Sequence, residues 1–208
     1  MVETSELVRK GRKYEQVLDG ARDVFMAQGY EGASVDDIAR AASVSKATLY
    51  SYFPDKSILF REVMLRECRL QSERMLPDHA YSAPPRETLL SMAREISRFL
   101  VSPFPIKLFR VCIAESFRFP DVGQAFYETG PRLMRDRFVA YLKMCSARGQ
   151  LAIEDYELAA EQFAELAKAD LFVGALLGID QNITDDRIER IANGAVDTFL
   201  ARYGTEAS

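Results

Sequence analysis

The segment from Ser34 to Lys56 constrains the fold of this chain more than any other part, because it contains two helix starts in close succession. Ser34 can accept a hydrogen bond from a backbone N–H two or three residues later. Asp36 and Asp37 follow in the first turn, where the helix dipole favours negative charge. Ser45 can cap a second helix in the same way. Two short helices joined this closely must cross at a steep angle.

The second helix, predicted from Lys46 to about Phe53, has a buried side and an outward side. Leu49 and Phe53 lie four positions apart, so both point into a core. The outward side carries small or short polar side chains, which suit the approach of a helix to bases in a DNA major groove. The candidate contacts on this helix and its cap are Ser45, Lys46, Ala47, Thr48, Tyr50 and Ser51.

Other side chains near this helix are suited to DNA phosphates. Tyr52, like Tyr50, offers a hydroxyl that donates without an ionic cost. Lys56 stands at the expected start of another helix, where backbone N–H groups are free. Ser34 completes the predicted DNA-contacting set. The alternative is a simple packing of two helices, in which both tyrosines are half-buried and contact no DNA.

Residues from about Tyr14 to Met64 resemble the N-terminal DNA-binding domain of the TetR/AcrR family of transcriptional regulators. The resemblance rests on Gly29-Tyr30, Ser34, Ile38-Ala39, Val44-Ser45-Lys46, Thr48-Leu49-Tyr50, Tyr52-Phe53 and Lys56. Ser43 and Ala47 stand where glycine is frequent in that family. Ser43 must then adopt a left-handed backbone conformation at a modest steric cost. Ala47 adds a methyl group that can touch a thymine methyl.

Apolar residues recur at three- and four-residue spacing along most of the chain, which predicts helices. Besides the two short ones, the predicted helices span about 11–28, 55–75, 87–101, 106–118, 121–128, 131–148, 155–177 and 185–203. No strand pattern is visible. We therefore expect an all-α fold, with a three-helix helix-turn-helix domain in residues 1–55 and a helical regulatory and dimerisation domain in residues 56–208.

The C-terminal region resembles, more weakly, the regulatory domain of AefR-like members of the same family, through the stretches 114–120 and 147–151. In the family at large, the last two helices pair with their copies in a partner chain. Here those two helices are more apolar than one buried stripe requires. The resulting dimer-interface candidates are Phe163, Leu166, Leu171, Ile188, Ile191, Ala195 and Phe199. Simple burial within one subunit is the alternative.

Aromatic side chains in the middle helices suggest a pocket for an unidentified apolar or aromatic effector. Glu115 lies in an apolar run, where it can orient a ligand or form a salt bridge to Arg118 or another basic residue. The ligand-pocket candidates are Phe104, Phe109, Cys112, Glu115, Phe119, Phe126, Tyr127, Met134, Phe138, Tyr141, Phe163 and Phe172. As a set, these residues are also what a helical core looks like.

The net charge of -4 argues against a globally basic protein that binds nucleic acid without specificity. Specific binding needs only a local basic patch, which the N-terminal arm supplies with Arg9, Lys10, Arg12 and Lys13. These residues can contact phosphate or the minor groove. A solvated terminus is the equally weighted alternative.

Other classes of function find little support in the sequence. The cysteines Cys68, Cys112 and Cys145 are far apart and predict reduced thiols in a cytoplasmic protein, with a redox-sensing thiol as the alternative. The lone histidine, His79, lies in a predicted loop. Without a metal-ligand cluster, a phosphate-binding glycine loop or a nucleophile motif, we expect no enzyme, no metal and no cofactor. No apolar stretch approaches the roughly 20 residues that span a bilayer.

The resemblance implies a homodimer that binds a palindromic operator in double-stranded DNA and responds to a ligand. Two recognition helices related by a twofold axis read half-sites about one helical turn, roughly 34 Å, apart. Regulators of this kind are most often repressors. An activator of the same family, or a helical interaction protein with degenerate DNA binding, is the alternative.

Overall fold

The computed structural model describes residues 11–75, 81–180 and 182–206. Within these ranges the regular elements are helices, apart from one isolated β-bridge between Leu151 and Gly204, so the predicted all-α fold is confirmed. None of the helices in the described ranges is long and apolar enough to cross a membrane. The chain forms two compact units: unit 1 comprises residues 1–66 and 111–126, and unit 2 comprises residues 67–110 and 127–208.

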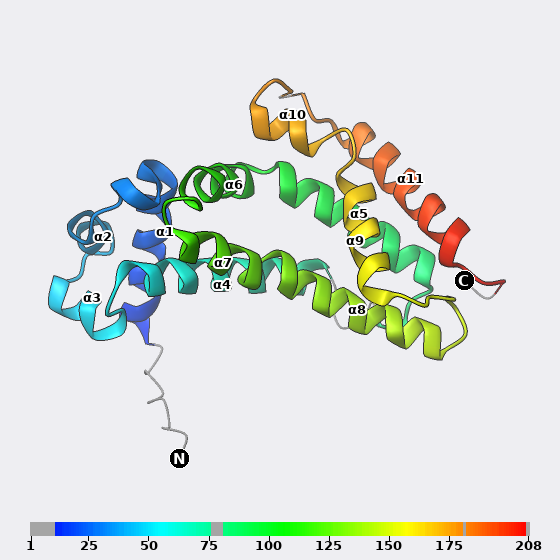
Figure 1. Cartoon of the computed structure of the whole chain (residues 1–208), viewed down its shortest axis with the longest axis horizontal. Helices are drawn as coiled ribbons and strands as arrows, with labels where there is room; N and C mark the ends of the chain where they lie inside the picture. Colours follow the sequence, from blue (N-terminus) through cyan, green and yellow to red (C-terminus); the bar gives the residue numbers. More distant parts are fainter. Residues whose placement is uncertain (1–10, 76–80, 181, 207–208) are drawn as a thin grey trace, which may run out of the picture. The chain divides into compact units, whose positions relative to one another are not determined.

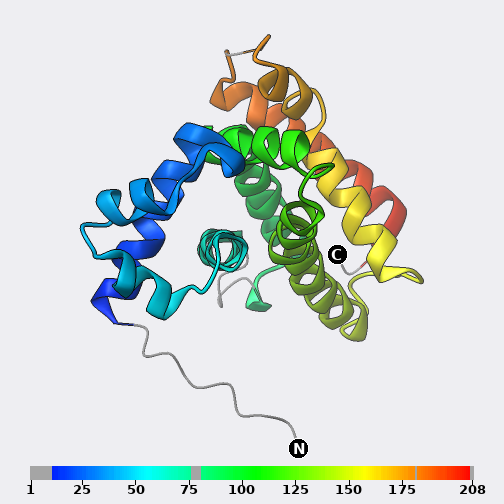
Figure 2. The same ribbon diagram turned by 60° about the vertical axis from the view of Figure 1, so that its left-hand side comes forward.

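Unit 1 contains the short helices predicted from the caps. Its elements are α1 (Arg12–Gly32), α2 (Val35–Ala41), α3 (Lys46–Tyr52), the first part of α4 (Lys56–Met75), the end of α6 (Pro103–Glu115) and the start of α7 (Pro120–Thr129). The helix α2 contacts both α1 and α3, and the three lie together in two views (Figures 1 and 2). The predicted boundary between residues 55 and 56 separates a DNA-binding domain from a regulatory domain. The division into compact units does not test these roles, so the boundary stays a prediction.

The core of unit 1 is aromatic. The ring of Phe25 meets the ring of Phe60 edge-on at a centroid distance of 5.1 Å. Tyr14 packs on Phe53 at 5.1 Å and donates a 2.7 Å hydrogen bond to Glu62 of α4. Burial and the bond to Glu62 both raise the pKa of Tyr14. The core of unit 1 also includes Ile38, Leu49 and Phe53, and the last two are buried as predicted.

The sequence predicts a helix that ends at about residue 28, but α1 continues past Gly29. Gly29 has φ 77° and ψ 176°, a conformation essentially restricted to glycine, and the chain then makes one more helical turn to Gly32. The prediction that the helix ends before Gly29 was wrong, because this glycine kinks the helix instead of terminating it. This kink aims Tyr30 into the core, where its ring lies 5.3 Å from that of Phe60.

Unit 2 is a packed group of longer helices. Its elements include α5 (Pro85–Val101), α8 (Pro131–Ala147), α9 (Tyr156–Lys168), α10 (Phe172–Leu177) and α11 (Asp185–Tyr203). The helix α9 contacts α5, α8 and α11, and α11 also contacts α5 (Figure 2). Phe138, Phe163 and Phe199 meet in the core with ring centroids 5.1 to 6.3 Å apart.

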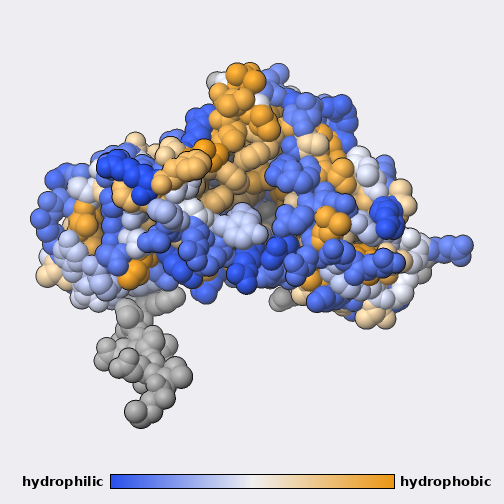
Figure 3. All heavy atoms as spheres, viewed as in Figure 1, coloured by the Kyte–Doolittle hydropathy of each residue, from blue (hydrophilic) through white to orange (hydrophobic). Residues whose placement is uncertain are grey.

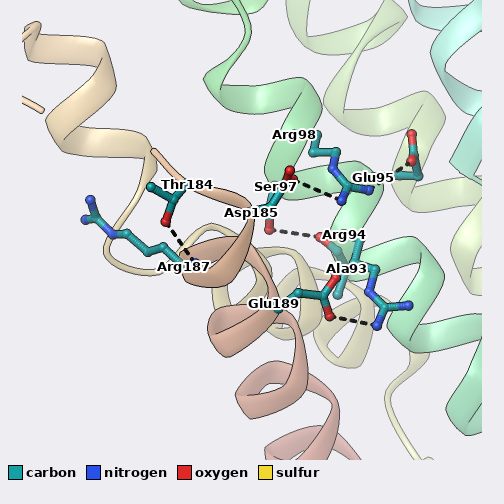
Figure 4. A network of polar contacts seen from close by, with 9 residues as sticks. All are labelled: Ala93, Arg94, Glu95, Ser97, Arg98, Thr184, Asp185, Arg187 and Glu189. Carbon is teal, nitrogen blue, oxygen red and sulfur yellow. Dashed lines mark hydrogen bonds and ion pairs between the residues drawn. The ribbon is translucent and has the colours of Figure 1, made fainter. Parts of the chain in front are cut away.

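Polar contacts fix how α11 lies on α5 (Figure 4). Arg94 pairs with Glu189 at 2.7 Å, and Arg98 pairs with Asp185 at 3.2 Å. Thr184 caps α11 by accepting from the N–H of Arg187. Because such partly exposed pairs contribute only about 0.2–1 kcal/mol each, the buried apolar faces supply most of the stability and the pairs mainly set the register.

The predicted helix 155–177 is two helices. The helix α9 ends at Lys168 and α10 begins at Phe172, because Asp170 between them has a left-handed φ of 62°. Arg187 donates to the backbone carbonyl of Asp170, and Arg190 pairs with its carboxylate at 3.0 Å. The local sequence has neither glycine nor proline at the break, so apolar periodicity alone could not reveal it.

Three helices begin at prolines that the sequence prediction left just outside them. The helix α6 begins at Pro103, not at residue 106, and ends at Glu115, not at 118. Likewise α5 begins at Pro85 and α7 at Pro120. Proline is tolerated in the first turn because the N–H that it lacks has no intrahelical acceptor there.

Candidate nucleic-acid interface

The predicted cap of the first short helix is present in unit 1. The hydroxyl of Ser34 accepts from the N–H of Asp37 at 3.1 Å, and it donates to the Asp37 carboxylate at 2.7 Å. Arg40 donates to the same carboxylate at 2.7 Å. These side-chain hydrogen bonds, first from Ser34 and then from Arg40, lower the pKa of Asp37. The exposed Ser34 hydroxyl is therefore already held in place by its own helix.

The turn between α2 and α3 has the conformation that the sequence requires. Ser43 has a φ of 53°, which confirms the left-handed conformation expected where the family frequently has glycine. The N–H of Val44 donates to the carbonyl of Ala39 at 3.0 Å and closes the turn. Because the turn is bonded to the end of α2, the start of α3 is fixed relative to α2.

The helix α3 begins at a second serine cap. Ser45 accepts from the N–H of Thr48 at 3.1 Å, and the two hydroxyls lie 2.9 Å apart. Ser51 donates to the backbone carbonyl of Thr48 at 2.7 Å. Leu49 is buried and anchors the opposite side of the helix. The hydroxyls of Ser45, Thr48 and Ser51 are thus held by bonds within α3 and its cap.

Four predicted residues form the exposed side of α3, here called the reading face: Lys46, Ala47, Tyr50 and Ser51. Nearly half of the Tyr50 side chain is exposed (48%), so it is not a buried staple. Lys46 forms an exposed ion pair with Asp36 of α2. The reading face presents one cation, one methyl group and two hydroxyls, which is a set able to contact phosphates and base edges.

Tyr52 and Lys56 have different surroundings. Tyr52 is half-buried and meets the Tyr14 ring edge-on at 5.8 Å, and its contact with phosphate stays a prediction. The Lys56 ammonium donates to the carbonyls of Glu31 and Ala33 at 3.3 and 3.2 Å. Burial lowers the pKa of Lys56, opposed by the charges of Glu115 and Glu31. Lys56 therefore supports the turn between α1 and α2 in this structure.

Basic residues near the predicted interface are only partly described. Arg9 and Lys10 lie outside the described residues, whereas Arg12 and Lys13 are exposed at the start of α1. Sequence reasoning overlooked Arg40, whose side chain is 76% exposed near the end of α2. The signal available for it was a basic residue in the last turn before the connecting turn.

The ligand-pocket candidates do not share one kind of environment. Phe138, Tyr141 and Phe163 are buried in the core of unit 2, with Phe138 stacked on Tyr141 and tilted against Phe163. In unit 2, Phe104, Phe109, Met134 and Phe172 are half-buried and Tyr127 is exposed. In unit 1, Cys112 is buried, and Glu115, Phe119 and Phe126 are half-buried.

One predicted residue, Phe172, lines a surface hollow of about 480 Å³ in unit 2. Lys168 and Arg187 also line it, together with the exposed apolar residues Val173 and Ile179. Apolar side chains gather over α10 in the space-filling view (Figure 3). The hollow combines an aromatic wall with cations, although Arg187 is already paired with Asp180.

The dimer-interface candidates are mostly buried within their own subunit. Leu166 is half-buried, and the others are buried: Phe163, Leu171, Ile188, Ile191, Ala195 and Phe199. The exposed residues of the same two helices include Leu158 on α9, and Gly194, Thr198 and Ala201 on α11. These positions, and not most of the predicted ones, are exposed on the two helices.

The cysteines are buried thiols. Burial raises the pKa of Cys68 to about 12 and also raises the pKa of Cys145. Such thiols form little of the reactive thiolate at neutral pH. Among the described residues, no group of three histidine, cysteine or acidic side chains is arranged to hold a metal ion.

Two family models match this chain. The model of bacterial regulatory proteins of the tetR family matches residues 17–63, and the model of the C-terminal domain of AefR-like transcriptional repressors matches residues 87–205. The HTH-type negative transcriptional regulator IcaR of the biofilm operon icaADBC from Staphylococcus aureus (strain Newman) is 33% identical over 48 residues. That alignment covers 23% of this chain and 26% of IcaR, so it spans about a quarter of the relative's length.

Solved structures are similar over nearly the whole chain. The Flavonoid-responsive Regulator FrrA is 33% identical with a TM-score of 0.80, over 95% of this chain and 100% of that one. A protein from Mesorhizobium loti MAFF303099 that is assigned to the TetR family of transcriptional regulators is 28% identical, with a TM-score of 0.84. This match also covers 95% of this chain and 100% of that one. The similarity thus includes both the short helices of unit 1 and the longer helices of unit 2.

Proposed function

Because the chain belongs to the TetR family of transcriptional regulators, we propose that it is a homodimeric repressor that leaves a palindromic operator when a small effector binds. The observation that carries the proposal is the exposed reading face of α3, on a helix whose start and turn are both fixed by hydrogen bonds. The name of the partial relative IcaR, a negative regulator, supports repression over activation.

The DNA contacts divide into two kinds. Lys46, Ala47 and Thr48 lie in the first turn of α3, the part of a recognition helix that reaches base edges. The hydroxyls of Tyr50, Ser51 and Tyr52, and those of Ser34 and Ser45 at the caps, serve phosphates. Lys46 exchanges its pairing with Asp36 for DNA. Lys56 contributes indirectly, because it supports the turn between α1 and α2.

Selection of bound sequences from random DNA by the purified protein tests the proposal. We expect a twofold-symmetric site whose half-sites are about one helical turn apart. Tyr50→Phe should weaken binding to all sequences alike, with an unchanged dependence on salt, because it removes a neutral phosphate contact. A failure to enrich any palindrome would favour a helical interaction protein with degenerate DNA binding.

Dimerisation is part of this function, because one recognition helix reads only a few base pairs. We assign the contact between subunits to the outward sides of α9 and α11. The predicted residues Phe163, Leu171, Ile188, Ile191, Ala195 and Phe199 form the packed layer beneath that surface, and Leu166 reaches its edge. Sedimentation of the purified protein at micromolar concentration should show a dimer, and a monomer bound to a single half-site would overturn this part.

The effector is a small apolar or aromatic molecule. The half-buried aromatic side chains of unit 2, such as Phe104, Phe109 and Phe172, supply the chemistry to bind it. The name of the structural relative FrrA, a flavonoid-responsive regulator, supports an aromatic effector. A ligand can release DNA only by preferring the DNA-free state, through a shift of α4 that changes the spacing of the two recognition helices.

Titration of the protein with a flavonoid tests whether the effector is aromatic. Calorimetry measures the binding of the flavonoid, and a second assay measures the operator affinity in its presence. Binding with loss of operator affinity supports an aromatic effector, and binding that leaves operator affinity unchanged excludes that ligand as an effector. A reporter gene behind the selected operator separates repression from activation, because loss of a repressor raises expression. The proposal also places the protein in the cytoplasm with its DNA.

A further inference from the structure

Within unit 1, each polar group of Glu31 has a partner, at the end of α6, in the turn between α6 and α7, or on α4. Glu115, at the end of α6, accepts a hydrogen bond from the N–H of Glu31 at 3.3 Å. Arg118 forms an ion pair with the Glu31 carboxylate. Lys56, from α4, donates to the Glu31 carbonyl at 3.3 Å. Glu31 is thereby connected to two segments that are far from it in the sequence.

The kink at Gly29 explains why an N–H is available to Glu115. The conformation of Gly29 is not helical and interrupts the regular ladder of bonds in α1. The N–H groups that follow such an interruption resemble those at a helix start, which favour a negatively charged acceptor. A Cβ atom at Gly29 would lie 3.6 Å from the Glu115 carboxylate oxygen, so the carboxylate lies directly beside the kink.

Aromatic packing adds to these polar contacts. Phe119, just after the turn, meets the ring of Tyr30 edge-on at 5.3 Å. Tyr30 is buried, and the Lys56 ammonium lies 4.7 Å from its ring centre. The contact therefore has a desolvated part beside its exposed ion pair, and such a part is more stable than a surface ion pair alone.

The position of Glu31 matters because the DNA-contacting helices begin just after it. Ser34, the cap of α2, follows within three residues, and α2 leads through the Ser43 turn to α3. Lys56 also holds Ala33, which immediately precedes that cap. Whatever fixes Glu31 consequently fixes the entry of the chain into α2.

We propose that Glu115 is a positioning residue for DNA binding, which holds the turn between α1 and α2 in the conformation that presents the reading face. The inference rests on the proposed function and specifies its regulation. The helices α6 and α7 continue into unit 2, at residues 103–110 and 127–129. An effector that shifts either helix therefore alters the hold on Glu31.

The operator affinity of the Glu115→Ala variant tests the proposal, because the loss of a charge and the loss of a positioning contact change this affinity in opposite directions. Removal of an acidic charge by itself tightens DNA binding, yet we expect Glu115→Ala to weaken it about fivefold to tenfold because the turn is released. Glu115→Gln keeps an oxygen acceptor for the Glu31 N–H and should stay within about twofold of wild type. Asp23→Ala removes an exposed carboxylate from α1 and is the charge control, with affinity unchanged or tighter.

Amide hydrogen exchange of the DNA-free protein separates this inference from the proposed function. The N–H of Glu31 should exchange about fivefold to tenfold faster in Glu115→Ala than in wild type or Glu115→Gln. If wild-type protein selects no operator, the proposed function fails, while faster exchange still supports the role of Glu115 in holding the turn. Unchanged exchange, or operator binding by Glu115→Ala as tight as that of Asp23→Ala, overturns the inference.

Discussion

Gly20 of α1 lies so close to Ala42, at the end of α2, that a Cβ atom on Gly20 would come within 2.6 Å of the Ala42 nitrogen. The atom it would meet belongs to the backbone, which cannot swing aside like the end of a flexible side chain. The angle between α1 and α2, and with it the position of α3, therefore depends on a glycine at position 20.

Forcing extra volume into a packed contact usually costs about 1–3 kcal/mol, whereas helix propensity returns about 1 kcal/mol. We therefore expect Gly20→Ala to destabilise unit 1 by up to about 2 kcal/mol. Thermal unfolding followed by circular dichroism measures the change. Gly32→Ala is the control, because its Cβ would meet Gln28 at an ordinary 3.5 Å. Equal unfolding temperatures for the two variants would contradict the prediction.

The left-handed Ser43 offers a stabilising substitution. A left-handed backbone costs a residue other than glycine about 1–2 kcal/mol, and glycine costs up to about 1 kcal/mol more in chain entropy. We expect Ser43→Gly to raise the free energy of unfolding by less than about 1 kcal/mol, measured from the urea midpoint. Ala27→Gly, on the exposed side of α1, should lower it by about 1 kcal/mol. A destabilised Ser43→Gly protein would show that the serine side chain contributes more than its backbone costs.

Low pH should destabilise the start of α4, because protonation of Asp55 weakens the hydrogen bonds that its carboxylate accepts there. Its carboxylate accepts from the hydroxyl and N–H of Ser57, at 2.6 and 2.8 Å, and from the N–H of Ile58 at 2.9 Å. These bonds, the Ser57 hydroxyl first, lower the pKa of Asp55 below its unfolded value. Its contribution is therefore present above the unfolded pKa of about 3.9 and is lost as pH falls through the folded pKa.

Asp55→Asn keeps a capping oxygen but cannot titrate, so its stability should fall less than that of wild type between about pH 5 and pH 2. Urea unfolding at a series of pH values measures the difference. Parallel curves for the two proteins would show that Asp55 does not carry this part of the acid sensitivity.

The sequence predicted the local structure around the reading face because the causes are local. Ser34 and Ser45 cap their own helices. Ser43 adopts the left-handed backbone conformation at a position where the family frequently has glycine. The sequence predicted a helix end before Gly29, not a kink. The acceptor for the freed N–H could not be predicted either, since Glu115 lies 84 residues away in the sequence.

Contacts between distant segments account for what sequence reasoning missed. Asp170 breaks a helix because Arg187 and Arg190 hold it, and neither is near it in the periodic pattern. The phosphate contact of Lys56 stays a prediction, and the sequence did not reveal that its ammonium donates to the carbonyls of Glu31 and Ala33. Nothing in the sequence around Gly20 indicates the close approach of Ala42 that excludes a Cβ atom there.

Ala47 tests whether the first turn of α3 chooses the DNA sequence. The side chain is exposed, and a methyl group can touch a thymine methyl. Ala47→Gln should change the bases preferred by selection at one position in each half-site, because an amide instead favours adenine. Ala27→Gln, on α1, is the control and should select the wild-type site. If both variants select that site, Ala47 does not face the bases.

Gly194 tests whether α11 packs against a partner subunit. Within one subunit nothing lies within 4 Å of a Cβ at this position, so Gly194→Ala should stabilise the exposed helix by about 1 kcal/mol. In the proposed dimer, a partner helix packs on this same surface, where small residues allow close approach. We therefore expect Gly194→Ala to retain its helical content yet dissociate at higher concentration than wild type in sedimentation equilibrium. Gly32→Ala, on unit 1, should leave the dimer unchanged. A dimer as tight as wild type in Gly194→Ala would move the interface away from the middle of α11, because a methyl group there would then have met no partner atoms.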